Sequence, residues 1–504
     1  MFKKFCQCFG IASIILAGSY GDFLGGGEDV RMHVPFALTS ICLAQILDIL
    51  ILALVLFVIL APVRRLGLYD WARLVLALLI PPYLLQRIQS FLPESFLSGR
   101  VITFSIIWIA GLLMLRLRFP RWYKRTMRAA SAVATCVALF AVWSVIQLLW
   151  VATWKPGKQQ QVAAWATGTQ PPRQHPLIVW VLFDELSYDQ AFEHRARDLE
   201  MPNFDQLRKE STTFTNAQPI GYYTKRIIPS LFTGQIVDGF HYDMHNQFSV
   251  HYTGQKGFRP LNGTGTVFSD AQQAGFRTAV VGWYNPYCTI YANALDSCYW
   301  TNHDKLDGPM GEKETFGSNV YRPLRQFTQD IKSSRRANRD ICNYDVQQRL
   351  KTHLDLEDHA LSLLHTDQAD FVFLHMATPH SPNIWSRIHD DYTHVCDSSY
   401  LDNLELADRV MGDIMTTLKA SPRWKDTTLI VQGDHSWRVE TWEDTPTWTQ
   451  EDDAASTSAT FDPRPALIIH QPGQAEAKTV GEGWSLLKVH DVLEQSLHGQ
   501  PITY

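Results

Sequence analysis

The chain has 504 residues, a formal net charge of -5 and a pI near 6.4, so it carries no overall basic field and its charge argues against a nucleic-acid partner. The first third is apolar and the remainder is mixed, and this change in composition marks the main domain boundary. The sequence contains no internal repeat and no low-complexity tract.

Five apolar stretches precede residue 155, and most are long enough to cross a bilayer, which takes about 20 residues per helix. They are roughly Phe9–Phe23, Phe36–Pro62, Tyr69–Ile88, Val101–Leu117 and Ala129–Trp154. We therefore expect an N-terminal α-helical transmembrane bundle of about five helices over residues 1–154. The first stretch is the weakest, because Lys3 and Lys4 followed by a short apolar run and Ala17-Gly18-Ser19 are equally typical of a cleaved signal peptide.

Basic residues in the connecting loops predict the orientation of these helices. They alternate between loops, so that Lys3 and Lys4, Arg64 and Arg65, and a cluster over residues 116–128 fall on one side. The positive-inside rule assigns that side to the cytoplasm. With five crossings the chain leaves the membrane on the outer face after Trp154, and everything that follows is expected to be extracytoplasmic.

Four of the eight cysteines belong to this outer part, namely Cys288, Cys298, Cys342 and Cys396. An even number of cysteines in an oxidising compartment fits two disulfides. Cys288 with Cys298 is the closer pair, which leaves Cys342 with Cys396. The absence of C-x-x-C spacing disfavours metal binding by these thiols.

Residues 155–175 are polar and rich in Gln, Pro and Gly, which predicts a linker before a folded domain over residues 176–504. Apolar runs typical of buried strands lie at Leu177–Phe183, Thr278–Trp283, Asp370–His375, Thr427–Gln432 and Ala466–His470. Helical patterns separate them at Asn203–Glu210, Val267–Ala274, Leu354–Leu364, Leu401–Leu418 and Lys488–Leu497. This alternation predicts an α/β domain with a mostly parallel central sheet.

Polar residues follow two of the predicted strands. Asp184 and Glu185 follow the first, and Asp434 and His435 follow the fourth, at the carboxyl ends where ligands of parallel sheets gather. Asp184, Asp434 and His435, with the hydroxyl of Thr224, form a plausible four-ligand set for a divalent ion. Such an ion would stabilise the alkoxide of Thr224 and make it a nucleophile.

The segment after Thr224 is expected to begin a helix, whose N-terminal amides favour an anionic phosphate. Pro229 would then lie in or near the first turn, where its missing N–H does little harm. Taken singly, each site residue has an ordinary explanation, since an Asp after a strand is usually a turn residue or a helix cap. Their joint placement favours a site.

Five segments of the outer domain, in this order, resemble the sulfatase-like branch of the alkaline phosphatase superfamily across most of residues 175–500. They are Val181–Leu186, Met201–Leu207, Thr224 through Pro229–Gly234, Ala377–Pro382 and Thr427–His435. The resemblance implies an α/β sulfatase-like catalytic domain.

The chain departs from type I sulfatases at the nucleophile. Those enzymes have Cys or Ser there, oxidised to formylglycine and followed by Pro-Ser-Arg. Thr224 cannot give that aldehyde, because its extra methyl group would leave a ketone. The Arg is also missing, although Lys225 and Arg226 supply positive charge. A threonine nucleophile after about five membrane helices is instead similar to the lipoteichoic acid synthases and phosphoethanolamine transferases of bacterial envelopes.

This second resemblance implies an enzyme of the bacterial inner membrane, multi-pass, with its catalytic domain in the periplasm. Thr224 would attack the phosphorus of a phospholipid head group, diacylglycerol would leave, and a hydroxyl of an envelope glycan or lipid would take the phospho-group. His380 would move protons. One divalent ion (Mn, Zn, Mg or Ca) is implied, with Glu185 either a ligand or a supporting residue.

Two other functions stay open at this point. The same fold serves hydrolases, either a phosphodiesterase or an atypical sulfatase, and an inactive relative could bind envelope lipid or glycan. The complete set of Asp184, Thr224, Asp434 and His435 argues against an inactive chain.

Three further groups of residues have two readings each. His375 ends a predicted strand and is either a cap or part of the site. The cluster of His389, Asp390, Asp391 and His394 is either a second ligand site or a solvated loop, and the latter is favoured. Five aromatic residues are expected either to line the substrate cleft or to lie at the bilayer surface, and these are Trp283, Tyr284, Tyr287, Trp437 and Trp442.

Overall fold

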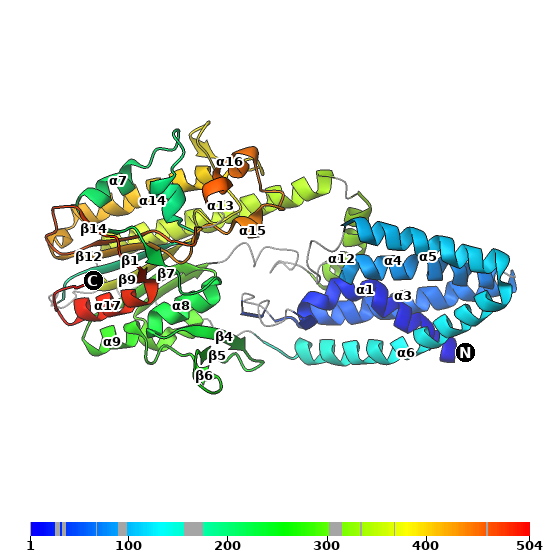
Figure 1. Cartoon of the computed structure of the whole chain (residues 1–504). Helices are drawn as coiled ribbons and strands as arrows, with labels where there is room; N and C mark the ends of the chain where they lie inside the picture. The colour runs from blue at the N-terminus through cyan, green and yellow to red at the C-terminus, as the bar shows by residue number, and fades with distance from the viewer. Residues whose placement is uncertain are drawn as a thin grey trace. The chain divides into compact units, whose positions relative to one another are not determined.

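The apolar run at residues 177–183 forms β1 (Ile178–Phe183), a strand inside the eight-stranded sheet of the computed structural model (Figure 1). All six side chains of β1 are buried, as a continuous apolar strand requires when both faces of a sheet are covered. The structure describes residues 2–25, 31–32, 37–66, 68–88, 98–155, 175–301, 315–332, 335–366, 368–459 and 462–504.

The central sheet has the strand order β14-β2-β13-β12-β1-β9-β7-β8. The other strands are β14 (Lys478–Val480), β2 (Thr212–Phe214), β13 (Leu467–His470), β12 (Thr428–Gly433), β9 (Phe371–Met376), β7 (Thr278–Trp283) and β8 (Ser297–Thr301). Among these strands β13 alone runs antiparallel to its neighbours, and the remaining pairs are parallel. The predicted mostly parallel sheet is confirmed.

Helices cover both faces of this sheet (Figure 1). One layer contains α7 (Pro202–Lys209), α13 (Arg335–Thr366) and α14 (Tyr400–Ala420). The other contains α8 (Thr224–Thr233), α9 (Val267–Gln273) and α17 (Val489–Leu497). The prediction for α13 was too short, because its first half is rich in charged and polar residues that hide the apolar periodicity.

The smaller elements lie between these layers and around them. Three small sheets pair β10 (Trp385–Ser386) with β11 (Asp391–Tyr392), β15 (Trp484–Ser485) with β3 (Ala217–Gln218), and β4 (Val237–Tyr242) with β5 (Phe248–Tyr252) and β6 (Arg259–Pro260). The short helices are α10 (Tyr287–Ile290), α15 (Val439–Trp442) and α16 (Gln450–Ala459). Single turns of 3-10 or π helix lie at 189–193, 292–294, 424–426 and 486–488.

Alternate residues of β1 build the two halves of the core. Val179 and Val181 pack in the same buried cluster as Met411 of α14. Trp180 points to the opposite layer, where its ring meets Phe232 of α8 edge-on at 5.6 Å between centroids. Burial of each such apolar side chain stabilises the fold by about 1.5–3 kcal/mol. The packing of β1 against both helix layers therefore fixes the position of the loop that follows it.

The chain divides into two units, and the first is helical. It contains α1 (Phe2–Gly25), α3 (Thr39–Arg65), α4 (Tyr69–Ile88), α5 (Ser98–Arg118) and α6 (Pro120–Ala152), with most of α12 (Phe316–Lys332). Each of the five predicted apolar stretches therefore contains a helix. Two helices of the described chain, α3 over Thr39–Leu60 and α6, are long and apolar enough to cross a membrane. The predicted linker lies almost wholly outside the described residues.

Both predicted disulfides form in the second unit, and they join Cys288 to Cys298 and Cys342 to Cys396. The second of them links the beginning of α13 to the loop after β11. The cysteines that are free lie in the helical unit, and these are Cys6, Cys8, Cys42 and Cys136.

Candidate active site

The site is built where β1 and β12 end side by side. These strands are parallel neighbours and Phe183 pairs with Gly433, so Asp184 and Asp434 follow at the same level of the sheet. A Cβ atom at Gly433 would lie 2.5 Å from the carbonyl oxygen of Leu186. The close approach of the two loops therefore requires glycine at this position.

Asp184, Asp434 and His435 are buried, and their potential ligand atoms lie within 4.8 Å of one another. His435 Nε2 is 3.2 Å from Asp434 Oδ2 and 3.8 Å from Asp184 Oδ1. The ring donates its Nδ1 proton to the Ser436 carbonyl over 2.8 Å, which leaves Nε2 without a proton in the neutral ring. His435 Nε2 and Asp184 Oδ1 have no hydrogen-bond partner among the described residues. Two facing acceptors without a proton between them fit a cation.

Thr224 is the first residue of α8, and its side chain is directed to this cluster. It is 7 % exposed, and its Oγ1 donates a hydrogen bond to Asp434 Oδ2 over 2.8 Å. Tyr223 is the N-cap and its side chain makes no capping bond. The helix begins one residue earlier than predicted, and Pro229 is its sixth residue, in the turn that follows the first.

His375, near the end of β9, is part of the site and not a strand cap. It is fully buried, and its Nε2 is 3.5 Å from Asp184 Oδ2 with no hydrogen-bond partner among the described residues. Its Nδ1 is 2.6 Å from the hydroxyl of Tyr287, whose ring would lie 2.6 Å from a Cβ atom at Gly282. Burial lowers the pKa of His375 to about 3, so the ring is neutral, with its Nε2 directed to Asp184 and its Nδ1 to Tyr287.

The two carboxylates of the cluster lie close together, and the charge of one affects the ionisation of the other. Burial and the charge of Asp434 raise the pKa of Asp184. Burial opposes ionisation of Asp434, but His435, His375 and the Thr224 hydroxyl hold its pKa below the usual range. In the described part of the chain neither aspartate forms an ion pair with lysine or arginine. Two such carboxylates match the charge of one divalent ion.

Glu185 turns away from this cluster. Its carboxylate accepts hydrogen bonds from Arg438 Nε at 2.6 Å and from the indole of Trp442 at 3.0 and 3.1 Å. Its backbone has a positive φ of 67°, and its amide donates to Asp434 Oδ1 over 3.2 Å. Of the two roles expected for Glu185, this geometry favours the supporting one over metal ligation.

His380 lies on the loop after β9 and is fixed on both sides. Its amide donates to the carbonyl of Asp184 over 3.1 Å, and its Nδ1 donates to the Ser381 carbonyl over 2.5 Å. The ring stands edge-on between Trp283 and Trp442, at 5.4 and 5.0 Å between centroids. Burial and nearby positive charge, that of Arg349 first, lower the pKa of His380. A neutral ring with a proton on Nδ1 can accept a second proton at Nε2.

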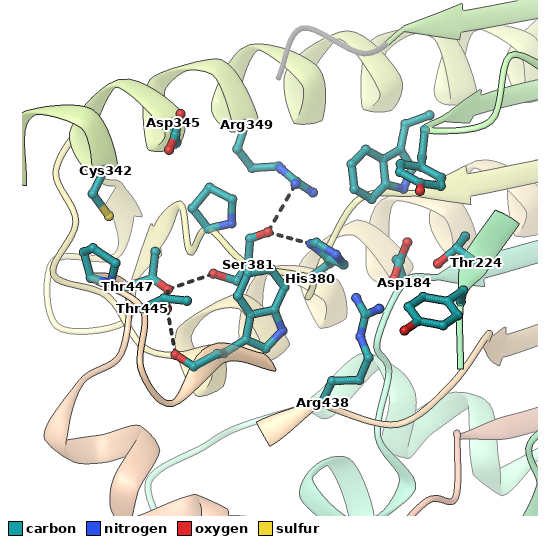
Figure 2. Close-up of a pocket in the computed structure, with 16 residues that line it drawn as sticks. Asp184, Thr224, Cys342, Asp345, Arg349, His380, Ser381, Arg438, Thr445 and Thr447 are labelled. Atoms are coloured by element: carbon teal, nitrogen blue, oxygen red, sulfur yellow. Dashed lines mark hydrogen bonds between the residues drawn. The ribbon is translucent and has the colours of Figure 1, made fainter. Parts of the chain in front are cut away.

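A cavity of about 530 Å³ joins these residues (Figure 2). Asp184, Thr224 and His380 line it, together with Arg349 and Arg438. These two arginines were not predicted. No sequence pattern places α13 at the cavity, and in the segment after His435 only the aromatic residues were considered for the cleft. The wall away from Asp184 contains polar side chains from α13, from the loop after β9 and from the loop after α15, and these are Asp345, Ser381, Thr445 and Thr447.

The comparison with known families agrees with this geometry. The family model described as Sulfatase matches residues 176–479. The chain belongs to the sulfatase family. The domain is therefore an enzyme of the alkaline phosphatase superfamily, whose sulfatase-like members are metal-dependent, and the cluster of Asp184, Asp434 and His435 could hold the ion. No curated protein sequence matches the chain.

Several solved structures are similar to this chain in fold. Ps i-CgsB in complex with a neocarrahexaose is 16% identical, with 66% of this chain and 73% of that chain covered and a TM-score of 0.41. The phosphonate monoester hydrolase of Agrobacterium radiobacter is 14% identical, with 64% and 74% covered and a TM-score of 0.38. The lipoteichoic acid synthase LtaP of Listeria monocytogenes is 13% identical, with 65% and 72% covered and a TM-score of 0.37.

The five aromatic residues considered for the substrate cleft divide into three sets. Trp283, Tyr284 and Trp442 line the cavity. Tyr287 is fully buried behind His375. Trp437 belongs to the hydrophobic core and does not reach the cavity. The expectation of a cleft lined by aromatic residues therefore fits three of the five.

The titratable cluster at residues 389–394 is a solvated loop. His389, Asp390, Asp391 and His394 are all exposed, and Asp390 forms an ion pair with Arg409. No group of potential metal ligands among the described residues includes any of these four side chains.

Proposed function

We propose that this enzyme transfers a phospho-group of the phosphoglycerol or phosphoethanolamine type from a phospholipid head group to an envelope glycan or lipid. The transfer proceeds through a phosphothreonine at Thr224. The observation that carries the proposal is the position of the Thr224 hydroxyl, 2.8 Å from Asp434 Oδ2, at the N-terminus of α8 and in the same cavity as His380. A threonine at this point cannot become formylglycine, so the hydroxyl itself is the nucleophile.

The residues suited to a metal ion are Asp184, Asp434 and His435, with the Thr224 oxygen beside them. One divalent ion, Mn, Zn, Mg or Ca, would supply positive charge that lowers the pKa of the hydroxyl and offsets the charge of the phospho-group. The unpartnered Asp184 Oδ1 and His435 Nε2 support this site.

The protein groups perform the transfer in two halves. In the first, the Thr224 oxygen forms a bond to phosphorus, the bond from phosphorus to the diacylglycerol oxygen breaks, and the proton lost by Thr224 is balanced by the one diacylglycerol gains. In the second, the acceptor oxygen bonds to phosphorus, the bond to Thr224 breaks, and Thr224 recovers a proton. His380 Nε2 faces the cavity and accepts the proton of the acceptor hydroxyl.

The chain is proposed to be an inner-membrane protein with residues 1–154 spanning the membrane, a linker at 155–175 and the catalytic domain on the periplasmic side. The two helices that are long and apolar enough to cross a bilayer support anchoring in a membrane. Both disulfides lie in the second unit, and disulfides persist in oxidising compartments. A site facing the outer leaflet would have phospholipid head groups as donors.

The test is to incubate the full-length protein in lipid nanodiscs with Mn²⁺ and with phosphatidylglycerol or phosphatidylethanolamine labelled in the head group. We expect label on residue 224 in the native protein and in Thr224→Ser, which keeps the hydroxyl, and none in Thr224→Ala. Label that appears only as a free water-soluble product, and never on an acceptor, would identify a phosphodiesterase. Sulfate-ester turnover that survives Thr224→Ala would refute the proposal.

A further inference from the structure

Arg438 supplies a positive charge in the cavity that the two-step transfer above does not use. It directly precedes α15 and lines the cavity with Asp184, Thr224 and His380. Figure 2 shows its guanidinium directed to the space between His380 and Asp184. This is the space that a group bound to Thr224 would enter.

The guanidinium is held in place by one buried carboxylate. Arg438 Nε and Nη2 both lie 2.6 Å from Glu185 Oε1. The indole of Trp442 donates to both oxygens of the same carboxylate, so Glu185 is held from two sides. The Glu185 side chain is fully buried and that of Arg438 is 12 % exposed. An ion pair this far from solvent holds a long side chain in one orientation.

The backbone of Glu185 explains why two consecutive acidic residues have different partners. Asp184 faces the two histidines, whereas Glu185, in the left-handed region at φ 67°, faces Arg438. That conformation is unfavourable for a residue with a side chain. Two bonds maintain it here, from the Glu185 amide to Asp434 Oδ1 at 3.2 Å and from the Tyr400 hydroxyl to the Glu185 carbonyl at 2.6 Å.

One edge of the guanidinium remains available to a ligand. The contacts with Glu185 use Nε and Nη2, and Nη1 makes no hydrogen bond with any residue in the described part of the chain. Guanidinium groups bind the oxygens of phosphate esters through charge-assisted hydrogen bonds. The Arg of type I sulfatases is missing after Thr224, so Arg438 places a guanidinium in this cavity from a different segment of the chain.

We propose that Arg438 binds a non-bridging oxygen of the phospho-group, and that Glu185 is a positioning residue that aims Arg438 and is not a metal ligand. The proposal rests on the proposed function only for the identity of the oxyanion, because a sulfate ester would present the same oxygens. It separates the roles of two neighbouring acids, with Asp184 for the ion and Glu185 for the arginine.

The experiment uses full-length protein in detergent with Mn²⁺, and it measures bound metal by mass spectrometry and the affinity for inorganic phosphate by calorimetry. We expect Glu185→Gln to keep its metal and to bind phosphate about 10-fold more weakly, as expected when a charged hydrogen-bonding group loses its support. Asp184→Asn should lose metal. Arg438→Lys keeps the charge but not the planar fork, and we expect a similar loss of phosphate affinity with full metal content.

Two comparisons complete the design. In Arg438→Lys the further change Glu185→Gln should have no additional effect, because the two residues act through one contact. Arg464 forms ion pairs with Glu193 and Asp462 and does not line the cavity, so Arg464→Lys is the control. It should bind phosphate like the native protein. Thermal unfolding identifies variants that fail to fold. If Glu185→Gln does not fold, the phosphate affinity of Arg438→Lys decides whether Arg438 binds the oxyanion.

Loss of metal from folded Glu185→Gln would overturn the assignment, and so would unchanged phosphate affinity in Arg438→Lys. The outcome for the proposed function is separate. If no label reaches Thr224 while Arg438→Lys still weakens phosphate binding, phospho-transfer fails and the oxyanion role of Arg438 stands.

Discussion

Thr224 Oγ1 donates a hydrogen bond to Asp434 Oδ2, and this single contact joins the N-terminus of α8 to the end of β12 across 210 residues of sequence. It directs the hydroxyl to the buried cluster of Asp184, Asp434 and His435. The Asp434 carboxylate thus contacts both the proposed nucleophile and the proposed metal site, and its removal should affect both.

We expect Asp434→Asn to fold but to lose bound metal, since an amide has no negative charge to balance a cation. Metal content by mass spectrometry after dialysis checks this. Asp270→Asn is the matched control, because Asp270, His490 and Glu494 form another carboxylate–histidine group, but a partly exposed one. Equal metal loss from both variants would contradict the assignment of the site.

His375 should contribute to metal affinity, a role that the sequence left open. Its Nε2 is 3.5 Å from Asp184 Oδ2, and Tyr287 fixes the ring. We expect His375→Gln to weaken Mn²⁺ binding by more than about 10-fold and Tyr287→Phe to weaken it less, as outer partners of metal sites do. Titration with Mn²⁺ measures both. A native affinity in His375→Gln would show that the ring only fills space.

The residues that sequence could and could not predict differ in a physical way. Asp184 and Asp434 follow apolar runs, and parallel strands bring their carboxyl ends to one edge, so their proximity was predictable. The direction of Glu185 depends on a left-handed backbone that an acidic residue rarely adopts, and no pattern signals it. Predicting that His375 reaches the site requires knowing to which face of the sheet the side chains of β9 point and how β9 is aligned with its neighbours. Predicting the position of Arg349 requires the full extent of α13, and the polar first half of that helix has no apolar periodicity.

His380 is expected to act in the second half of the transfer. Its Nδ1 proton is donated to the Ser381 carbonyl, so Nε2 is the nitrogen that accepts the proton of an acceptor hydroxyl. We expect His380→Gln to slow transfer by about 10²–10⁴-fold while label still reaches Thr224, so that phosphothreonine accumulates. Time courses of labelled protein and labelled acceptor separate the two steps. His389→Gln, on the exposed loop, should behave as the native protein, and absence of label on Thr224 in His380→Gln would place His380 in the first half.

The two disulfides should stabilise the second unit by different amounts. In the chain-entropy description the stabilisation grows with the separation of the cysteines, which is 54 residues for Cys342–Cys396 and 10 for Cys288–Cys298. We expect loss of the longer link to lower the free energy of unfolding by about 4 kcal/mol and loss of the shorter one by about 3 kcal/mol. Denaturant unfolding of the paired Cys→Ser variants measures both values. A larger effect from the shorter link would contradict the entropic account.

Glu357 on α13 should make the stability of the second unit dependent on pH. Burial first, and then the charge of Asp413, raise its pKa from 4.5 to about 7. His353, 3.4 Å away, does not offset this, because burial lowers its own pKa to about 3 and keeps the ring neutral. Between pH 4.5 and 7 the folded protein therefore binds more protons at Glu357 than the unfolded chain does.

Stability contributed by protonated Glu357 is thus fully present below pH 4.5 and is lost as the pH rises to about 7. Glu357→Gln keeps the shape without the ionisation, so we expect it to be about 1–3 kcal/mol more stable than the native protein at pH 8 and nearly equal to it at pH 4.5. Denaturant unfolding at the two pH values measures the difference. Glu443→Gln, an exposed matched change, should show little effect at either pH. A Glu357→Gln variant that is less stable than the native protein at pH 8 would mean that the ionised carboxylate has a favourable partner in the fold.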